Sequence, residues 1–211
     1  NIPAWVVGSL LQHYTQGRVG TSNERGSFWN GNAMLYAQDS TAKASIPLLM
    51  IGWKIKFGMQ KFIDITFTAS DKTIAKAALT KNGLVVDNVN LGLSLDQLSP
   101  LVVNLGSLNL SGNVHVNASN LLLAKKMQGN INVQLNDVGS GMSPVNPIGS
   151  YTVTVNLGDG SLNVSSDSSS VINVTGNGNM NSGLVLSSKV QEDKKTQLLQ
   201  LMTMMGVPQV D

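Results

Sequence analysis

The glycine-rich stretch GSFWNGNAML, residues 26–35, is the first place where residue type and spacing could do chemistry. Gly26 and Gly31 have the spacing of the two glycines in a phosphate-binding loop, whose backbone N–H groups cradle phosphate. Such a loop also needs a Lys and a Ser or Thr after its second glycine, followed by a helix. Asn32 follows instead, and the next residues read as a strand. The stretch therefore predicts a tight connection between two strands, with Trp29 driven into a core.

Few residues could act as a base or as a pair of acids in catalysis. His13 and His115 are the two histidines of the chain. We expect both to be solvated, because His13 falls on a predicted helix and His115 on the polar side of a predicted strand. No spacing holds two carboxylates as a general acid and base. The carboxylates considered are Asp64, Asp71, Asp87, Asp96, Asp137, Asp159, Asp167, Glu192 and Asp193.

Metal and nucleotide sites have equally weak support. Met202, Met204 and Met205 could bind a soft copper ion, but packing along a helix face is the favoured interpretation. The glycines of residues 176–183 have the composition of a nucleotide loop, yet they lie between two predicted strands and favour a long hairpin turn. The chain has no cysteine, which excludes disulfides, thiolate zinc sites and thiol catalysis. We expect no cofactor, no metal and no enzymatic activity.

Composition narrows the partners and the compartment. Charged residues make up 12% of the 211 residues and the net charge is +2. A globular protein usually has about 25% charged residues. A dense basic patch for nucleic acid is therefore not expected. No stretch reaches the roughly 18 apolar residues of a membrane span. Because the sequence opens abruptly on NIPAWVVGSLLQHY, we interpret it as a trimmed fragment whose N-terminal membrane anchor is absent.

Alternation of apolar and polar residues, the pattern of half-buried strands, recurs along most of the chain. The polar positions are mainly Asn, Ser and Thr, so one face of each strand is apolar and the other is wet. The alternating apolar positions are Trp53, Ile55 and Phe57; Ile63, Ile65 and Phe67; Val89, Leu91, Leu93 and Leu95; Leu108, Leu110, Val114 and Val116; Ile131, Val133 and Leu135; Tyr151, Val153, Val155 and Leu157; Leu162 and Val164; Ile172 and Val174; and Leu184, Leu186 and Val190.

Turn and helix signals complete the expected fold. Asn82-Gly83 and Asp159-Gly160 predict two-residue hairpin turns, because these residues tolerate positive φ. Helical spacing predicts a short helix over residues 3–14 and a second helix over residues 194–205. The fold class is therefore mainly β: curved antiparallel sheets that fold over or pack as an open-sided sandwich, with a short N-terminal helix and a C-terminal helix. Residues 1–211 would form a single domain, or two sub-sheets over about 1–142 and 143–211.

The order of several motifs resembles the type II secretion system protein N family. These motifs are IPAWVVGSLLQHYTQGRV, RGSFWNGNAML, IGWKIKF, GNINVQLNDV, NPIGSYTVTV and LLQLMTMMGVPQVD, and they span nearly the whole chain. The residues that carry the resemblance, which we expect to be structural, are Gly26, Ser27, Trp29, Gly31, Trp53, Gly149 and Tyr151.

The resemblance implies a periplasmic β domain, similar to AsmA-like envelope proteins, that follows one bacterial inner-membrane helix. It implies a non-enzymatic accessory component that contacts other type II secretion proteins, as a scaffold between the inner-membrane platform and the outer-membrane secretin. The alternative is a lipid-binding or lipid-transfer module. Near the membrane, Trp5 should be less buried than Trp29 and Trp53. We also expect an open strand edge near the C-terminal helix, where a partner strand could add.

Overall fold

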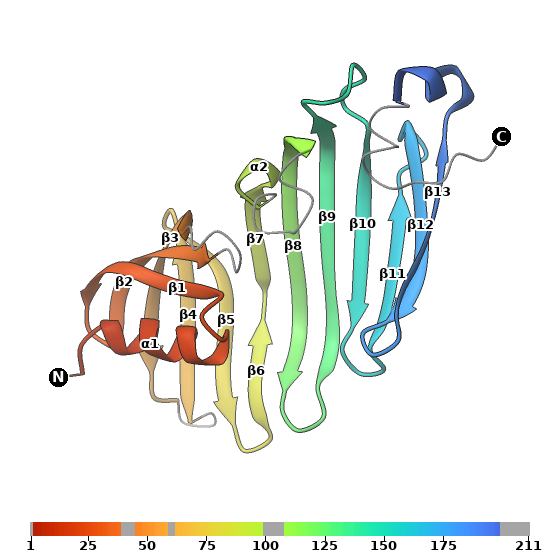
Figure 1. Cartoon of the computed structure of the whole chain (residues 1–211). Coiled ribbons are helices and arrows are strands. Elements are labelled where there is room, and N and C mark those ends of the chain that lie inside the picture. Colours follow the sequence, from red (N-terminus) through yellow and green to blue (C-terminus); the bar gives the residue numbers. More distant parts are fainter. Residues whose placement is uncertain (1, 39–44, 59–61, 99–107, 199–211) are drawn as a thin grey trace. The chain divides into compact units, whose positions relative to one another are not determined.

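The protein is built almost entirely of β-strands (Figure 1). The computed structural model describes residues 2–38, 45–58, 62–98 and 108–198. The elements in chain order are α1 (Trp5–Tyr14), β1 (Val19–Gly26), β2 (Asn30–Gln38), β3 (Ser45–Lys56), β4 (Ile63–Ala69), β5 (Lys72–Thr80), β6 (Gly83–Asp87), β7 (Val89–Ser94), α2 (Leu95–Leu98), β8 (Leu110–Leu123), β9 (Gln128–Ser140), β10 (Gly149–Asn156), β11 (Ser161–Ser166), β12 (Ile172–Asn179), β13 (Gly183–Val190) and η3 (Glu192–Lys194).

The described strands form one sheet of 13 strands, not two stacked sheets. Neighbours follow chain order from β1 to β6, continue with β8, and end at β13, while β7 pairs with β8. The registered neighbours are antiparallel, as hairpin connections require. The predicted mainly β, antiparallel class is therefore confirmed, in the form of one open sheet.

The chain divides into two compact units. The first unit comprises Asn1–Leu91 and Ala118–Gly129, and the second comprises Gly92–Asn117 and Asn130–Asp211. Each unit has its own cluster of buried apolar side chains. In the first unit this cluster is small and is centred on Trp53.

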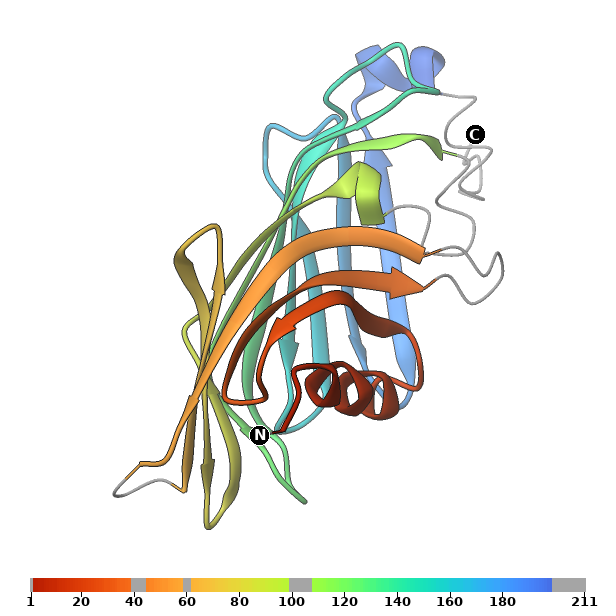
Figure 2. The ribbon, with the colours of Figure 1, turned by 90° about the vertical axis from the view of Figure 1, so that its left-hand side faces the viewer.

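Helix α1 packs on β1 in the first unit, within the curve of β1 and β2 (Figure 2). The predicted helix over residues 3–14 is confirmed, with its first turn at Trp5. Gly8 lies where helix and strand are closest: a Cβ there would overlap the Thr21 hydroxyl. A glycine at this position thus lets the helix approach the sheet without displacing Thr21, which is itself buried.

The second unit has the larger apolar cluster, to which almost every element of the unit contributes. Leu198 is fully buried in it, at the end of a helical segment that continues η3 through residues 195–198. The start of the predicted C-terminal helix, at about residue 194, is thus confirmed. Residues 199–205 of the predicted helix, with Met202, Met204 and Met205, lie outside the described residues. The buried members of the cluster are Leu95, Leu108, Val114, Val138, Ile148, Ile172, Val190 and Leu198.

The hairpin turns differ in detail from those predicted. Thr80 pairs with Gly83, so the two-residue turn between β5 and β6 is Lys81-Asn82, one residue before the predicted pair. A second two-residue turn, which the sequence did not predict, joins β4 to β5 through Ser70 and Asp71. Both of its residues have positive φ, 47° and 64°, as a type I′ turn requires.

The predicted two-residue turn at Asp159-Gly160 is wrong, because the loop between β10 and β11 has four residues, 157–160. Asn156 Oδ1 accepts the Gly158 N–H at 2.8 Å, and Asp159 Oδ1 accepts the Ser161 N–H at 2.9 Å. The Ser161 N–H also lowers the pKa of Asp159. These side-chain turns supply a longer connection, and Gly160, at φ +74°, completes it.

The glycine-rich stretch over residues 176–183 is also more regular than predicted. Strand β12 continues to Asn179 and β13 begins at Gly183, so a three-residue turn replaces the expected long one.

A pair of glycine substitutions in the β10–β11 loop tests its backbone geometry. Gly160→Ala should lower the free energy of unfolding by about 1–2 kcal/mol, because a Cβ is disfavoured in the left-handed region. Gly158→Ala is the matched control, since Gly158 lies in the same loop without positive φ. Urea denaturation measures both, and equal effects would contradict the described loop.

Candidate interaction surfaces

Trp53 is the anchor of the first unit. Its side chain is 2% exposed, and its Nε1–H donates to Phe28 O at 3.0 Å and to Ser27 O at 3.2 Å. The indole also packs over Gly31, where an added Cβ would lie 2.6 Å from Trp53 Cζ2. The indole of β3 therefore closes the turn between β1 and β2 from one side.

The turn that Trp53 closes contains most of the residues that carry the family resemblance. Gly26 pairs with Gly31 across the turn and has φ +92°. Ser27 N–H donates to Asn30 O at 2.9 Å. The start of the chain joins the same place, since Pro3 forms a bridge with Ser27. Gly26, Ser27, Gly31 and Trp53 are thus brought together by the fold.

The prediction that Trp29 is a buried anchor is wrong, because its side chain is only half-buried. Trp29 lies in the turn itself, where its ring is close to two other aromatic rings. Its ring centroid is 5.1 Å from that of Phe28, edge-on, and 5.2 Å from that of Phe57. Phe57 is 76% exposed. We call Phe28, Trp29 and Phe57 the aromatic cluster.

The expected order of tryptophan exposure is confirmed. Trp5, on α1, is 58% exposed, whereas Trp29 is half-buried and Trp53 is buried. Trp5 therefore presents an aromatic surface at the beginning of the described chain.

Gly149 and Tyr151, the other two residues of the resemblance, lie on β10 in the second unit. A Cβ on Gly149 would lie 2.6 Å from Ser170 Cβ, so the glycine allows close contact with this buried serine. Ser170 Oγ accepts the Ser150 N–H at 3.0 Å, and the Tyr151 hydroxyl donates to Ile172 O at 3.1 Å. Burial raises the pKa of Tyr151 to about 12. Both residues therefore join β10 to β12 and the loop before it.

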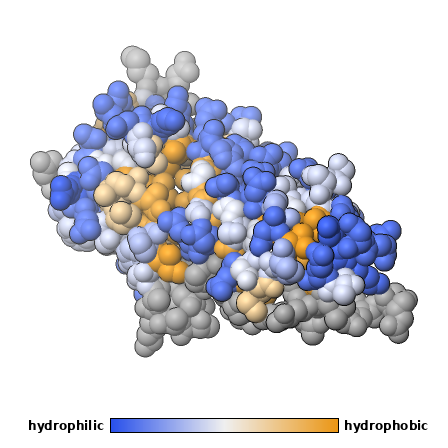
Figure 3. All heavy atoms as spheres, turned by 90° about the horizontal axis from the view of Figure 1, so that it is seen from above, coloured by the Kyte–Doolittle hydropathy of each residue, from blue (hydrophilic) through white to orange (hydrophobic). Residues whose placement is uncertain are grey.

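Many apolar strand residues of the first unit are only half-buried. Every residue of β4 and of β6 is of this intermediate kind. Seen from above, hydrophobic atoms are visible between hydrophilic ones (Figure 3). A single-layer sheet leaves this apolar surface available to a ligand or a partner.

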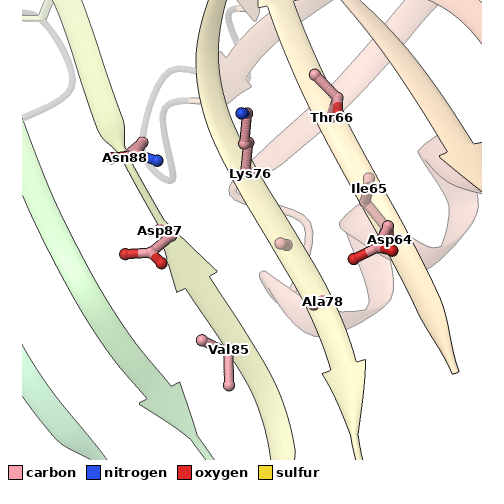
Figure 4. A pocket seen from close by; sticks show the side chains of 9 residues that line it. Asp64, Ile65, Thr66, Lys76, Ala78, Val85, Asp87 and Asn88 are labelled. Atoms are coloured by element: carbon pink, nitrogen blue, oxygen red, sulfur yellow. The ribbon is translucent and has the colours of Figure 1, made fainter. Parts of the chain in front are cut away.

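A cavity of about 250 Å³ lies over β4, β5 and β6 (Figure 4). Lys76 stands across from Asp87 in the register of β5 and β6, and Asp64 lies on the neighbouring β4. Asp87 Oδ1 accepts the Asn120 N–H at 2.9 Å, which gives it a structural role. Neither His13, exposed on α1, nor His115, half-buried on β8, lines this cavity. Within the described ranges, no group of three His, Cys, Asp or Glu residues could hold a metal ion.

The two end strands of the sheet are protected to different degrees. Strand β1 has a register irregularity between Ser22 and Arg25, carries Glu24 and Arg25, and packs against α1. These are devices that prevent edge-to-edge association. On β13, all residues but the last are exposed, and Val185 is 76% exposed. Among the described strands β13 has no neighbour beyond it, so it is an edge strand of the described sheet, and the open edge near the C-terminal helix stays a prediction.

Substitution of Trp53 tests its role as the anchor. Trp53→Ala should lower the free energy of unfolding by about 3–5 kcal/mol, the range for emptying a large aromatic site. Trp29→Ala is the control and should cost less, because its side chain is half-exposed. Chemical denaturation compares the two, and a larger loss for Trp29→Ala would contradict this assignment.

Tyr151 should make the stability of the fold sensitive to alkaline pH. The folded-state pKa is raised to about 12 from 10, so the unfolded chain loses its proton first. Stability should therefore fall as pH rises from about 10 to 12. Tyr151→Phe removes the titrating group, and its urea midpoint should fall less steeply over this window. Parallel slopes for the two proteins would show that Tyr151 is not responsible.

Comparison with known proteins places the chain in a family. No described helix is long and apolar enough to span a membrane. No curated protein and no solved structure matched the chain. A family model described as type II secretion system (T2SS), protein N, matches residues 17–211. This match includes the turn closed by Trp53, the β10 pair Gly149 and Tyr151, and the open edge β13, and the chain therefore belongs to the type II secretion system protein N family.

Proposed function

We propose that this protein is a non-enzymatic scaffold of the type II secretion system, acting in the periplasm between the inner-membrane platform and the outer-membrane secretin. The observation that carries the proposal is the family match over nearly the whole chain.

The aromatic cluster is the contact surface that this role requires in the first unit. Phe57 is 76% exposed and stacks against Trp29, whose carbonyl accepts the Ile55 N–H at 2.7 Å. The turn beneath is fixed by Trp53, so the cluster is rigid before a partner arrives. Rigid aromatic side chains supply much of the binding energy at protein interfaces. The partner is another protein of the secretion system.

The exposure of Trp5 supports attachment to the inner membrane through a preceding helix. A tryptophan that follows a membrane span suits the depth of the lipid headgroups. Trp5 begins α1 and is 58% exposed. In this proposal α1 lies at the membrane surface and orients the first unit.

Secretion from a bacterial strain lacking the gene tests the proposed function. The wild-type gene should restore export, and Phe57→Ala should restore it only in part, because the cluster loses its most exposed ring. Phe62→Ala is the matched control, since Phe62 is 64% exposed and lies outside the cluster. Export at the wild-type level without the gene would contradict the scaffold role. Equal export with both variants, at equal protein levels, would contradict the contact surface alone.

A lipid-binding or lipid-transfer module is the second candidate. The uniformly half-buried residues of β4 and β6 favour it, because they leave apolar surface that no second sheet of described strands covers. An acyl chain would gain about 25 cal/mol for each Å² of apolar surface removed from water. Mass spectrometry of the organic extract of the purified protein tests this candidate. It predicts stoichiometric phospholipid, and an extract without lipid would count against it.

A further inference from the structure

We propose that the β13 edge binds a second copy of this chain, by antiparallel pairing of β13 with β13 about a two-fold axis at Val185. The edge has three adjacent large apolar residues at high exposure: Leu184 at 40%, Val185 at 76% and Leu186 at 56%. Lys189 is the only charged residue of the strand. An edge of this composition lacks the charges that prevent strand addition.

The hydrogen-bond register identifies which backbone groups face outward. Gln191 N–H donates to Val171 O at 3.0 Å, next to the paired residues Ile172 and Val190. In an antiparallel ladder, hydrogen-bonded pairs alternate with pairs whose groups point away. The odd-numbered residues of β13 therefore bond to β12. The N–H and C=O groups of Leu184 and Leu186 point to the open side.

The residue pattern is symmetric about Val185, which makes the edge complementary to itself. With the two-fold axis at Val185, Leu184 of each copy lies opposite Leu186 of the other copy. These are the residues whose backbone groups point outward, so each pair exchanges both of its N–H···O bonds. Val185 meets Val185 of the second copy on the other face. Each of the three exposed apolar residues thereby gains an apolar cross-strand neighbour.

Neighbouring registers are less favourable. An axis at Leu186 would place Leu184 opposite Ser188 and Val185 opposite Ser187, so both would lose their apolar partners. The Val185 axis also places Gly183 opposite Ser187. Lys189 would then stand opposite Asn181 of the turn, so no like charges meet across the pair. The pairing of apolar side chains and the separation of the two Lys189 charges therefore both favour the register with its axis at Val185.

A single engineered cysteine tests the axis directly, because the chain has no cysteine of its own. Val185 would form a non-hydrogen-bonded pair with its copy, with Cα atoms about 4.5 Å apart. This separation lies within the usual range for a disulfide. Val185→Cys should therefore convert to a disulfide-linked dimer under mild oxidation, seen by non-reducing electrophoresis. Ser187→Cys is the control: it lies on the same face, but the two cysteines would be about 14 Å apart.

A charge exchange in solution supplies the second arm. Val185→Lys and Val185→Glu should each be monomeric by light scattering, whereas an equal mixture of the two should form a heterodimer. Cross-linking at position 187 in place of 185 would overturn the register. A wild-type chain that is monomeric at high concentration, as expected if the edge takes a strand of a different protein, would overturn the proposal. These outcomes do not depend on whether the gene is needed for secretion.

Discussion

The rest of this structure depends on one property of its open sheet: the sheet ends in two edge strands, and no second sheet of described strands covers its apolar positions. The described strands run in order from β1 to β13 without closing on themselves. At the first edge, α1, a register irregularity and two charged residues protect the backbone. The second edge has no such protection among the described residues, and its exposed residues are apolar. The two edges therefore differ in how well they are protected against the addition of another strand.

The interior of the first unit depends on a single aromatic side chain. The Trp53 indole packs against Gly31, and its Nε1–H donates to two carbonyls of the turn between β1 and β2. Its buried neighbours are the small residues Ala4 and Ala33, and Val7, Ile55 and Phe67 pack against them while only partly buried. Because Trp53 fixes the backbone of this turn through hydrogen bonds, the side chain of Phe57 can be exposed without changing the conformation of the turn. Packing of the buried cluster and display of exposed aromatic surface are thereby divided between Trp53 and the neighbouring Trp29.

The sequence predicted the strands well and the tryptophans less well. Alternation is a local property, so β3, β4, β10 and β12 could be located from their apolar positions. The role of Trp29 could not, because a residue between two glycines is equally able to point into a core or out of a turn. The distinction depends on Trp53, which is 24 residues later in the chain and reaches the turn only through strand pairing.

The predictions of hairpin turns were wrong for a related reason: the turn depends on strand pairing and on side chains outside the turn. The residue pair Ser70-Asp71 is not a typical hairpin signal, yet the pairing of β4 with β5 places both residues at positive φ. Conversely, Asp159-Gly160 is a strong signal, but the side chain of Asn156 lengthened the loop. The open edge was predictable only from the family resemblance and the position of the C-terminal helix. Its self-complementary pattern became visible once the register of β12 with β13 was known.

We infer that the outward backbone groups of β13 are open in a single copy and become paired when two copies associate. Amide hydrogen exchange followed by NMR at increasing protein concentration tests this claim most directly. In dilute protein the amides of Val185 and Ser187 should exchange slowly and those of Leu184 and Leu186 quickly. At high concentration Leu184 and Leu186 should become protected as well. Protection of Leu184 and Leu186 that is already complete in dilute protein would contradict an open edge, and fast exchange at every concentration would contradict its pairing.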